Sequence, residues 1–172
     1  MEALTPEFAL AFRALMVQSL AQEMQVTRKV LASIPDNRRE YRPDPMSRSA
    51  WELAWHIAAD VWFLQGIANL RFETNPDLSH ANPACTATAL AEWYENQFAA
   101  ALSRARVMTP KQLVTEIALG GVAVRAGLRL PAVLYLLFLE KHTIHHRGQL
   151  TAYLRPMGAK VPAVYGPSAN EP

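Results

Sequence analysis

The stretch that decides the fold is residues 130–155, LPAVLYLLFLEKHTIHHRGQLTAYLR. A proline is tolerated in the first helical turn, and Pro156 disfavours helix in the residue before it. The pattern therefore predicts a helix that begins at Leu130–Pro131 and stops at Arg155. The apolar run Ala132–Leu139 exceeds what one stripe of a bundle helix requires, so either this helix is central or one of its faces meets a second subunit.

The first helix along the chain is expected at the N-terminus, from the Thr5-Pro6-Glu7 cap to Ile34–Pro35. Its apolar residues recur mostly at a spacing of three to five and predict one buried stripe. The stripe consists of Phe8, Phe12, Leu15, Leu20, Met24 and Leu31.

Two more helices lie between these. One starts at Ser49, whose capping box with Glu52 satisfies backbone donors in both directions, and continues to about Leu70. The other begins near Thr86 or Thr88 and ends at about Met108.

The fold class predicted from these patterns is all-α, a four-helix bundle in a single domain of residues 1–172. A hairpin of residues 113–119 and 122–128 around Gly120–Gly121 is the best strand candidate, so a short irregular or hairpin insertion precedes the fourth helix. The fifteen residues 71–85 reach about 50 Å when extended, whereas a helix of about 22 residues is about 33 Å long. This linker can therefore place the third helix parallel to the second.

Composition excludes several function classes. Of 172 residues, 51% are hydrophobic and 19% charged, with a net charge of +2, which demands neither nucleic acid nor an anionic membrane as partner. The longest apolar run has eight residues, where a membrane span needs about 20. The N-terminal segment is too acidic for a signal peptide, and the single cysteine, Cys85, excludes an internal disulfide. A cytoplasmic location is therefore expected.

The histidines carry the chemical signal. His142 and His146 stand at i and i+4 on one helix, so their imidazoles can converge on one metal ion. His56, among core-type residues of the second helix, is the natural third ligand, although a hydrogen-bonded core histidine is the alternative. His145 points elsewhere around the helix and is expected to be packed or exposed, and His80 is expected at the surface.

Nearby polar residues can orient the imidazole rings. Asp60 and Glu52 each lie one turn from His56 and can accept its free N–H, although Glu52 is better explained by the capping box. Gln149 can bond the ring of either neighbouring histidine or a substrate. Arg147 could meet an anionic substrate, but solvation is the more ordinary role of such an arginine.

Three stretches resemble the DinB-like (damage-inducible) superfamily of bacterial four-helix bundles, which includes YfiT-like metal-dependent hydrolases and thiol-dependent S-transferases. They are RPDPMSRSAWELAWHIAADVWF (residues 42–63), HTIHHRGQL (142–150) and LRPMGAKVPAVYGPS (154–168). Their order and spacing, with the helix pattern, cover nearly the whole chain.

The resemblance implies an up-down-down-up bundle, frequent homodimers, and His56, His142 and His146 as ligands of a divalent metal ion. Zinc, nickel and iron all accept imidazole, so the sequence does not name the metal. Three histidines leave a coordination position open, as in catalytic sites. The expected function is a thiol S-transferase or hydrolase whose partners are a small-molecule thiol or electrophile. The alternative is a non-catalytic metal-binding stress-response protein.

Overall fold

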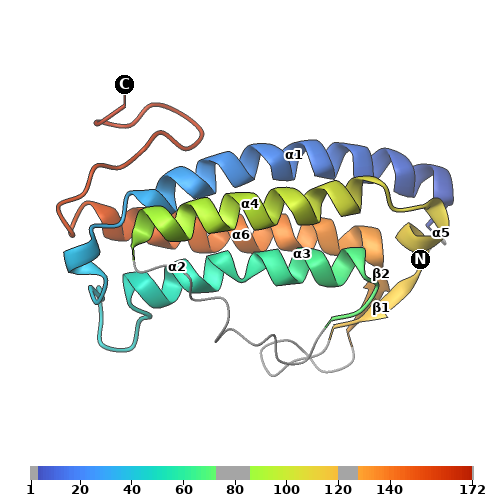
Figure 1. Cartoon of the computed structure of the whole chain (residues 1–172), viewed down its shortest axis with the longest axis horizontal. Coiled ribbons are helices and arrows are strands. Elements are labelled where there is room, and N and C mark those ends of the chain that lie inside the picture. Colours follow the sequence, from blue (N-terminus) through green and yellow to red (C-terminus); the bar gives the residue numbers. More distant parts are fainter. Residues whose placement is uncertain (1–3, 73–85, 120–127, 172) are drawn as a thin grey trace.

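The computed structural model describes residues 4–72, 86–119 and 128–171. The chain is mostly helical, and its long helices lie side by side along the longest axis of the molecule (Figure 1). The main helices are α1 (Pro6–Ala32), α2 (Ala50–Ala58), α3 (Asp60–Ala68), α4 (Ala87–Arg106) and α6 (Ala132–Leu154). Shorter elements are the 3₁₀ helix Asp36–Arg38, α5 (Pro110–Val114) and the strands β1 (Glu116–Ala118) and β2 (Arg129–Pro131). The colours of Figure 1 show that α1 and α6 run in one direction and that α2, α3 and α4 run in the other.

The helix starts agree with the predicted caps. The hydroxyl of Thr5 accepts a hydrogen bond from the backbone N–H of Phe8 at 3.2 Å. Both bonds of the capping box between Ser49 and Glu52 are present, and Thr86 caps α4. These contacts lie within three residues along the chain, so local sequence is sufficient to predict them.

The helix expected from Ser49 to Leu70 is interrupted, and this prediction was wrong. At Ala59 the backbone N–H of Trp62 bonds the carbonyl of Ala59 at 3.0 Å, an i+3 bond that tightens the turn and separates α2 from α3. Leu70 follows the end of α3 with a φ of 57°, which stops the helix. The interruption lies between His56 and Asp60 and so adjusts the relative direction of these two side chains.

The predicted hairpin is correct only in part. β1 and β2 pair antiparallel, with Ile117 opposite Leu130, so an insertion with two short strands does precede α6. The expected first arm began at Leu113, but this residue belongs to α5, which the Thr109–Gln112 capping box starts. Residues 120–127, which hold most of the second arm, lie outside the described residues, as does most of the 71–85 linker.

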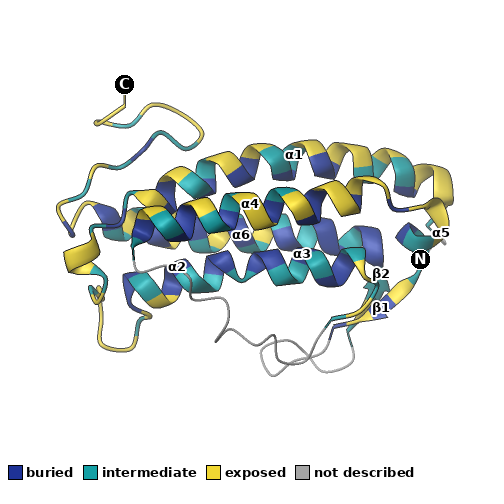
Figure 2. Cartoon of the chain, in the orientation of Figure 1, coloured by how far each residue is buried: buried dark blue, intermediate teal, exposed yellow. Residues whose placement is uncertain are grey.

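The buried stripe of α1 also differs from the prediction. Figure 2 shows that buried and exposed residues occur along the whole helix. Leu20, Met24 and Leu31 are buried, but Phe8 and Leu15 are 53% and 62% exposed. The inward face instead includes the polar residues Glu23 and Thr27, together with Ala9, Met16, Val17 and Val30.

Helix α6 is central. It contacts α1, α2, α3, α5 and β2, and five residues of its apolar run are buried within the chain: Ala132, Val133, Tyr135, Leu136 and Leu139. The length of the run thus follows from the central position of the helix and requires no second subunit. Within the described residues, no helix is both long and apolar enough to cross a membrane.

Candidate metal centre

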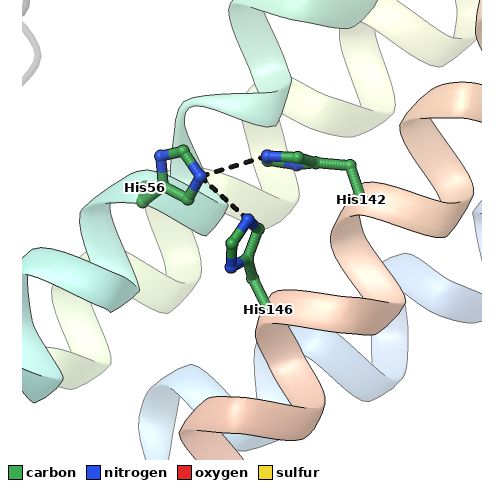
Figure 3. A group of neighbouring side chains, drawn as sticks. All are labelled: His56, His142 and His146. Atoms are coloured by element: carbon green, nitrogen blue, oxygen red, sulfur yellow. Dashed lines mark hydrogen bonds between the residues drawn. The ribbon is translucent and has the colours of Figure 1, made fainter. Parts of the chain in front are cut away.

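Three imidazoles converge between α2 and α6. His56 projects from the last turn of α2, and His142 and His146 project from successive turns of α6 (Figure 3). The Nε2 atom of His56 lies 3.1 Å from the Nε2 atoms of both His142 and His146. Around a tetrahedral ion with metal–nitrogen bonds of about 2.0–2.1 Å, ligand nitrogens are about 3.3–3.4 Å apart, so the observed spacing is close to that of a metal site.

The other ring nitrogens of the α6 histidines already have partners. The Nδ1 atom of His142 lies 2.8 Å from an oxygen of Asp60, and that of His146 lies 2.8 Å from Oε1 of Gln149. Because both partner atoms are acceptors, each Nδ1 carries the proton and each Nε2 presents a lone pair.

A neutral His56 can donate one proton to only one of these two lone pairs. At least one close contact between Nε2 atoms therefore lacks a proton to share. A divalent cation at the centre satisfies all three lone pairs at once, so the residues present fit a bound metal ion.

Asp60 holds the imidazole ring of His142 in place. Its side chain is 3% exposed, and the hydroxyl of Thr143 bonds the carboxylate oxygen that His142 leaves free. Burial raises the pKa of Asp60, while the hydrogen bonds from His142 and Thr143 oppose this shift. The sequence predicted Asp60 as a partner of His56, one turn away on the same helix, but the carboxylate orients His142 across the helix interface.

The environment keeps two of the imidazoles neutral. Burial, together with the charges of Arg48, His142 and His146, lowers the pKa of His56 to about 4. Burial also lowers the pKa of His146, against the hydrogen bond with Gln149. Neutral imidazole is the form that binds metal, so no proton has to leave these two rings at pH 7.

A pocket of about 420 Å³ opens beside the histidines. The three imidazoles, Asp60 and Arg48 form its polar lining. Arg48 was missed from the sequence. Its position directly before Ser49, the cap of the helix that carries His56, was the available signal. The remaining lining is apolar: Ala59, Phe63, Phe138 and Leu139.

Other residues considered from the sequence lie elsewhere. His145 is exposed and Glu52 completes the α2 capping box, while His80 and Cys85 fall outside the described residues.

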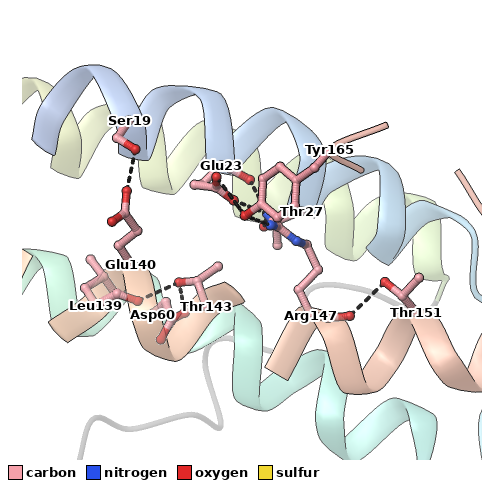
Figure 4. Close-up of polar contacts among 10 residues, drawn as sticks. All are labelled: Ser19, Glu23, Thr27, Asp60, Leu139, Glu140, Thr143, Arg147, Thr151 and Tyr165. Atoms are coloured by element: carbon pink, nitrogen blue, oxygen red, sulfur yellow. Dashed lines mark hydrogen bonds and ion pairs between the residues drawn. The ribbon is translucent and has the colours of Figure 1, made fainter. Parts of the chain in front are cut away.

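Arg147 is 1% exposed and forms an ion pair with Glu23 at 2.5 Å, so the prediction of a solvated arginine was wrong (Figure 4). Neither residue lines the pocket.

The chain is similar in sequence to known proteins. The uncharacterized proteins YrdA and YjoA of Bacillus subtilis (strain 168) are 29% and 27% identical to the chain over 149 and 151 residues. These alignments cover 87% and 83% of this chain and 85% and 88% of the relatives.

Solved structures show the same arrangement. A DinB-like protein from Bacillus cereus ATCC 10987 matches with a TM-score of 0.69 and 27% identity, covering 87% of this chain and 95% of that protein. The DinB-like protein YjoA of Bacillus subtilis matches in fold with a TM-score of 0.67 and 24% identity, covering 87% and 96%. The sequence profile of the DinB family matches residues 6–172, and the chain therefore belongs to the DinB family.

Proposed function

We propose that the protein is a divalent-metal-dependent enzyme, a thiol S-transferase or hydrolase, that binds its ion through His56, His142 and His146. One observation carries the proposal: three Nε2 lone pairs converge, and Asp60 and Gln149 hold two of the rings by their opposite nitrogens. This is the arrangement by which acceptor groups orient metal-binding histidines and raise their basicity.

The number of donors supports a catalytic rather than a structural site. The cluster found among the described residues comprises three histidines and no fourth protein ligand, and it borders the pocket. Structural zinc sites usually have four protein ligands, whereas catalytic sites keep one position for water or substrate.

In this proposal the ion activates the bound water or thiol, and residues of the chain position the ligands. A bound divalent ion would lower the pKa of a water molecule or thiol at its open position. The three neutral imidazoles leave the positive charge of the ion uncompensated, which favours an anionic partner. Asp60 and Gln149 keep the rings aligned, and Phe63, Phe138 and Leu139 limit the access of water.

The test begins with metal analysis of protein purified without a histidine tag. The proposal expects one divalent ion per chain, followed by activity in a screen of small thiols against electrophiles and of hydrolysable esters and amides. Metal bound without any turnover, at a site closed to small thiols, would instead favour the non-catalytic stress-response role.

Finer expectations accompany this proposal. We propose that the helices form an up-down-down-up four-helix bundle. The identity of the metal among zinc, nickel and iron, a small-molecule thiol or electrophile as partner, a homodimeric state and a cytoplasmic location all remain predictions.

A further inference from the structure

The pocket beside the histidines is lined by apolar side chains and by two charged ones. The rings of Phe63 on α3 and Phe138 on α6 stack with centroids 5.6 Å apart and line the pocket together with Leu139. Two charged side chains, Asp60 and Arg48, also belong to the lining.

Only one of these charges is available to a ligand. Asp60 is buried, and its two carboxylate oxygens bond His142 and Thr143. Arg48 is exposed and has no hydrogen bond or ion pair with another described residue.

Two neighbouring arginines have carboxylate partners. On the same connection between α1 and α2, Arg39 pairs with Asp36, and Arg42 pairs with Glu52 at 2.8 Å.

Arg48 lies close to the candidate metal centre. Its guanidinium lines the same pocket as His56, His142 and His146, so two positive charges would share this pocket once an ion is bound. A guanidinium beside a divalent ion is therefore unfavourable by itself. An anion bound between them would interact favourably with both.

We infer that Arg48 is a specificity-determining residue, which binds the carboxylate of a small amphipathic ligand whose apolar part lies against Phe63 and Phe138 and whose donor atom meets the metal. This inference rests on the proposed metal centre. The guanidinium can bind a carboxylate through two parallel N–H···O bonds, whereas the corresponding neutral alcohol offers no charge. The ligand class is thus a carboxylate-bearing thiol or thiol-like molecule.

The test measures binding by calorimetry with the zinc-loaded full chain. The probes are ω-mercaptoalkanoates of three to six carbons, each paired with the mercaptoalcohol of the same length. For the best-fitting length, we expect the acid to bind more tightly than the alcohol, and Arg48→Ala to reduce this ratio by about threefold to tenfold, because Arg48 is solvent-exposed. Comparing ratios between variants cancels the difference in acidity of the two thiols.

Three further variants sharpen the result. Arg48→Lys keeps the charge and should retain most of the preference, while Arg48→Glu should reverse it. Arg106→Ala removes an exposed arginine in the last turn of α4, away from this pocket, and should change nothing.

The outcomes separate the two proposals. A protein that takes up no zinc overturns the metal centre and, with it, this inference. Zinc uptake with an unchanged ratio in Arg48→Ala, or with no measurable binding of either probe at millimolar concentration, overturns the role of Arg48 and leaves the metal centre intact.

Discussion

The Nδ1 atom of His142 lies 2.8 Å from a carboxylate oxygen of Asp60, a residue of the neighbouring helix α3 that is almost completely buried. The contact places the ring proton on Nδ1 and turns the Nε2 lone pair toward His56. Asp60 thus acts on the candidate metal centre without being one of its donors.

Replacing Asp60 with Asn should weaken metal binding by about tenfold to a hundredfold, because the ring loses its anionic partner while the side chain keeps its size. Competition with a chromophoric chelator measures the affinity. Glu140→Gln is the matched control, since Glu140 lies on α6 with His142 and His146 but bonds Ser19 on α1 (Figure 4). Equal affinities for the two variants would contradict the role of Asp60.

Replacing His142 or His146 with Ala should abolish stoichiometric metal binding, because two remaining imidazoles make a much weaker site. His145→Ala should leave one ion per chain, since this exposed ring lies outside the cluster. Elemental analysis of the purified variants measures the ratio. Retention of metal by His146→Ala together with its loss in His145→Ala would show that the ligand set is a different one.

The features that the sequence predicted correctly depend on short separations along the chain. The caps at Thr5 and Ser49 need partners only three residues away, and the i, i+4 spacing brings His142 and His146 to one face of a helix. His56 was proposed because it lies among core-type residues of its helix, where a neutral histidine needs a partner.

The features that were missed depend on contacts between distant segments. From the sequence alone, Glu23 and Arg147 are expected at the surface, because charged residues are mostly exposed. In the structure both are buried, and they form an ion pair between α1 and α6. The hydroxyl of Tyr165, in the C-terminal segment, bonds both. Glu23 and Thr27 occupy the buried face of α1, where an apolar pattern expects no polar residue. The pattern selected Phe8 and Leu15 instead, and both are exposed.

The same ion pair leads to a prediction about stability. Arg147→Met or Glu23→Gln should each lower the free energy of unfolding by about 3–5 kcal/mol, because each change leaves a buried partner unpaired. Urea unfolding followed by circular dichroism measures the loss. The double variant should recover part of it, since neither charge then remains buried alone.

An exposed pair provides the control for this measurement. Arg129 and Glu116 are 3.9 Å apart, with side chains about 60% exposed, so Arg129→Met should cost no more than about 1 kcal/mol. Equal losses in Arg147→Met and Arg129→Met would contradict the importance of burial.

The low pKa of His56 predicts how the stability of the metal-free protein depends on pH. Between its ordinary pKa of 6.5 and its pKa of about 4 in the folded protein, the unfolded chain binds a proton on His56 that the folded protein does not. The contribution of this group to stability is therefore complete above pH 6.5 and is lost as the pH falls toward 4.

Urea unfolding of the stripped protein over this pH range tests the prediction. His56→Gln cannot titrate and should lose less stability on acidification than the original chain. The raised pKa of Asp60 acts in the opposite direction in both proteins, so the informative quantity is the difference between them. Parallel pH profiles would contradict a depressed pKa of His56.

The last prediction concerns whether the chain needs the metal ion in order to fold. The cluster occupies one pocket between α2 and α6, whereas the apolar core extends along α1, α3, α4 and α6. Because this core is much larger than that of a zinc finger, we expect the metal-free chain to keep its helical circular dichroism and a cooperative thermal transition. Added metal should stabilise it only by mass action, by about 2.7 kcal/mol when free metal is about a hundredfold above Kd.

The matched control is His146→Ala, whose thermal midpoint should respond much less to the same metal concentrations. The stripped original chain should also take the ion back and regain its ability to bind small thiols, because Asp60 and Gln149 hold two rings in place without the metal. An unfolded chain after chelation would show instead that the ion is structural, and this result would favour the non-catalytic role over the enzyme.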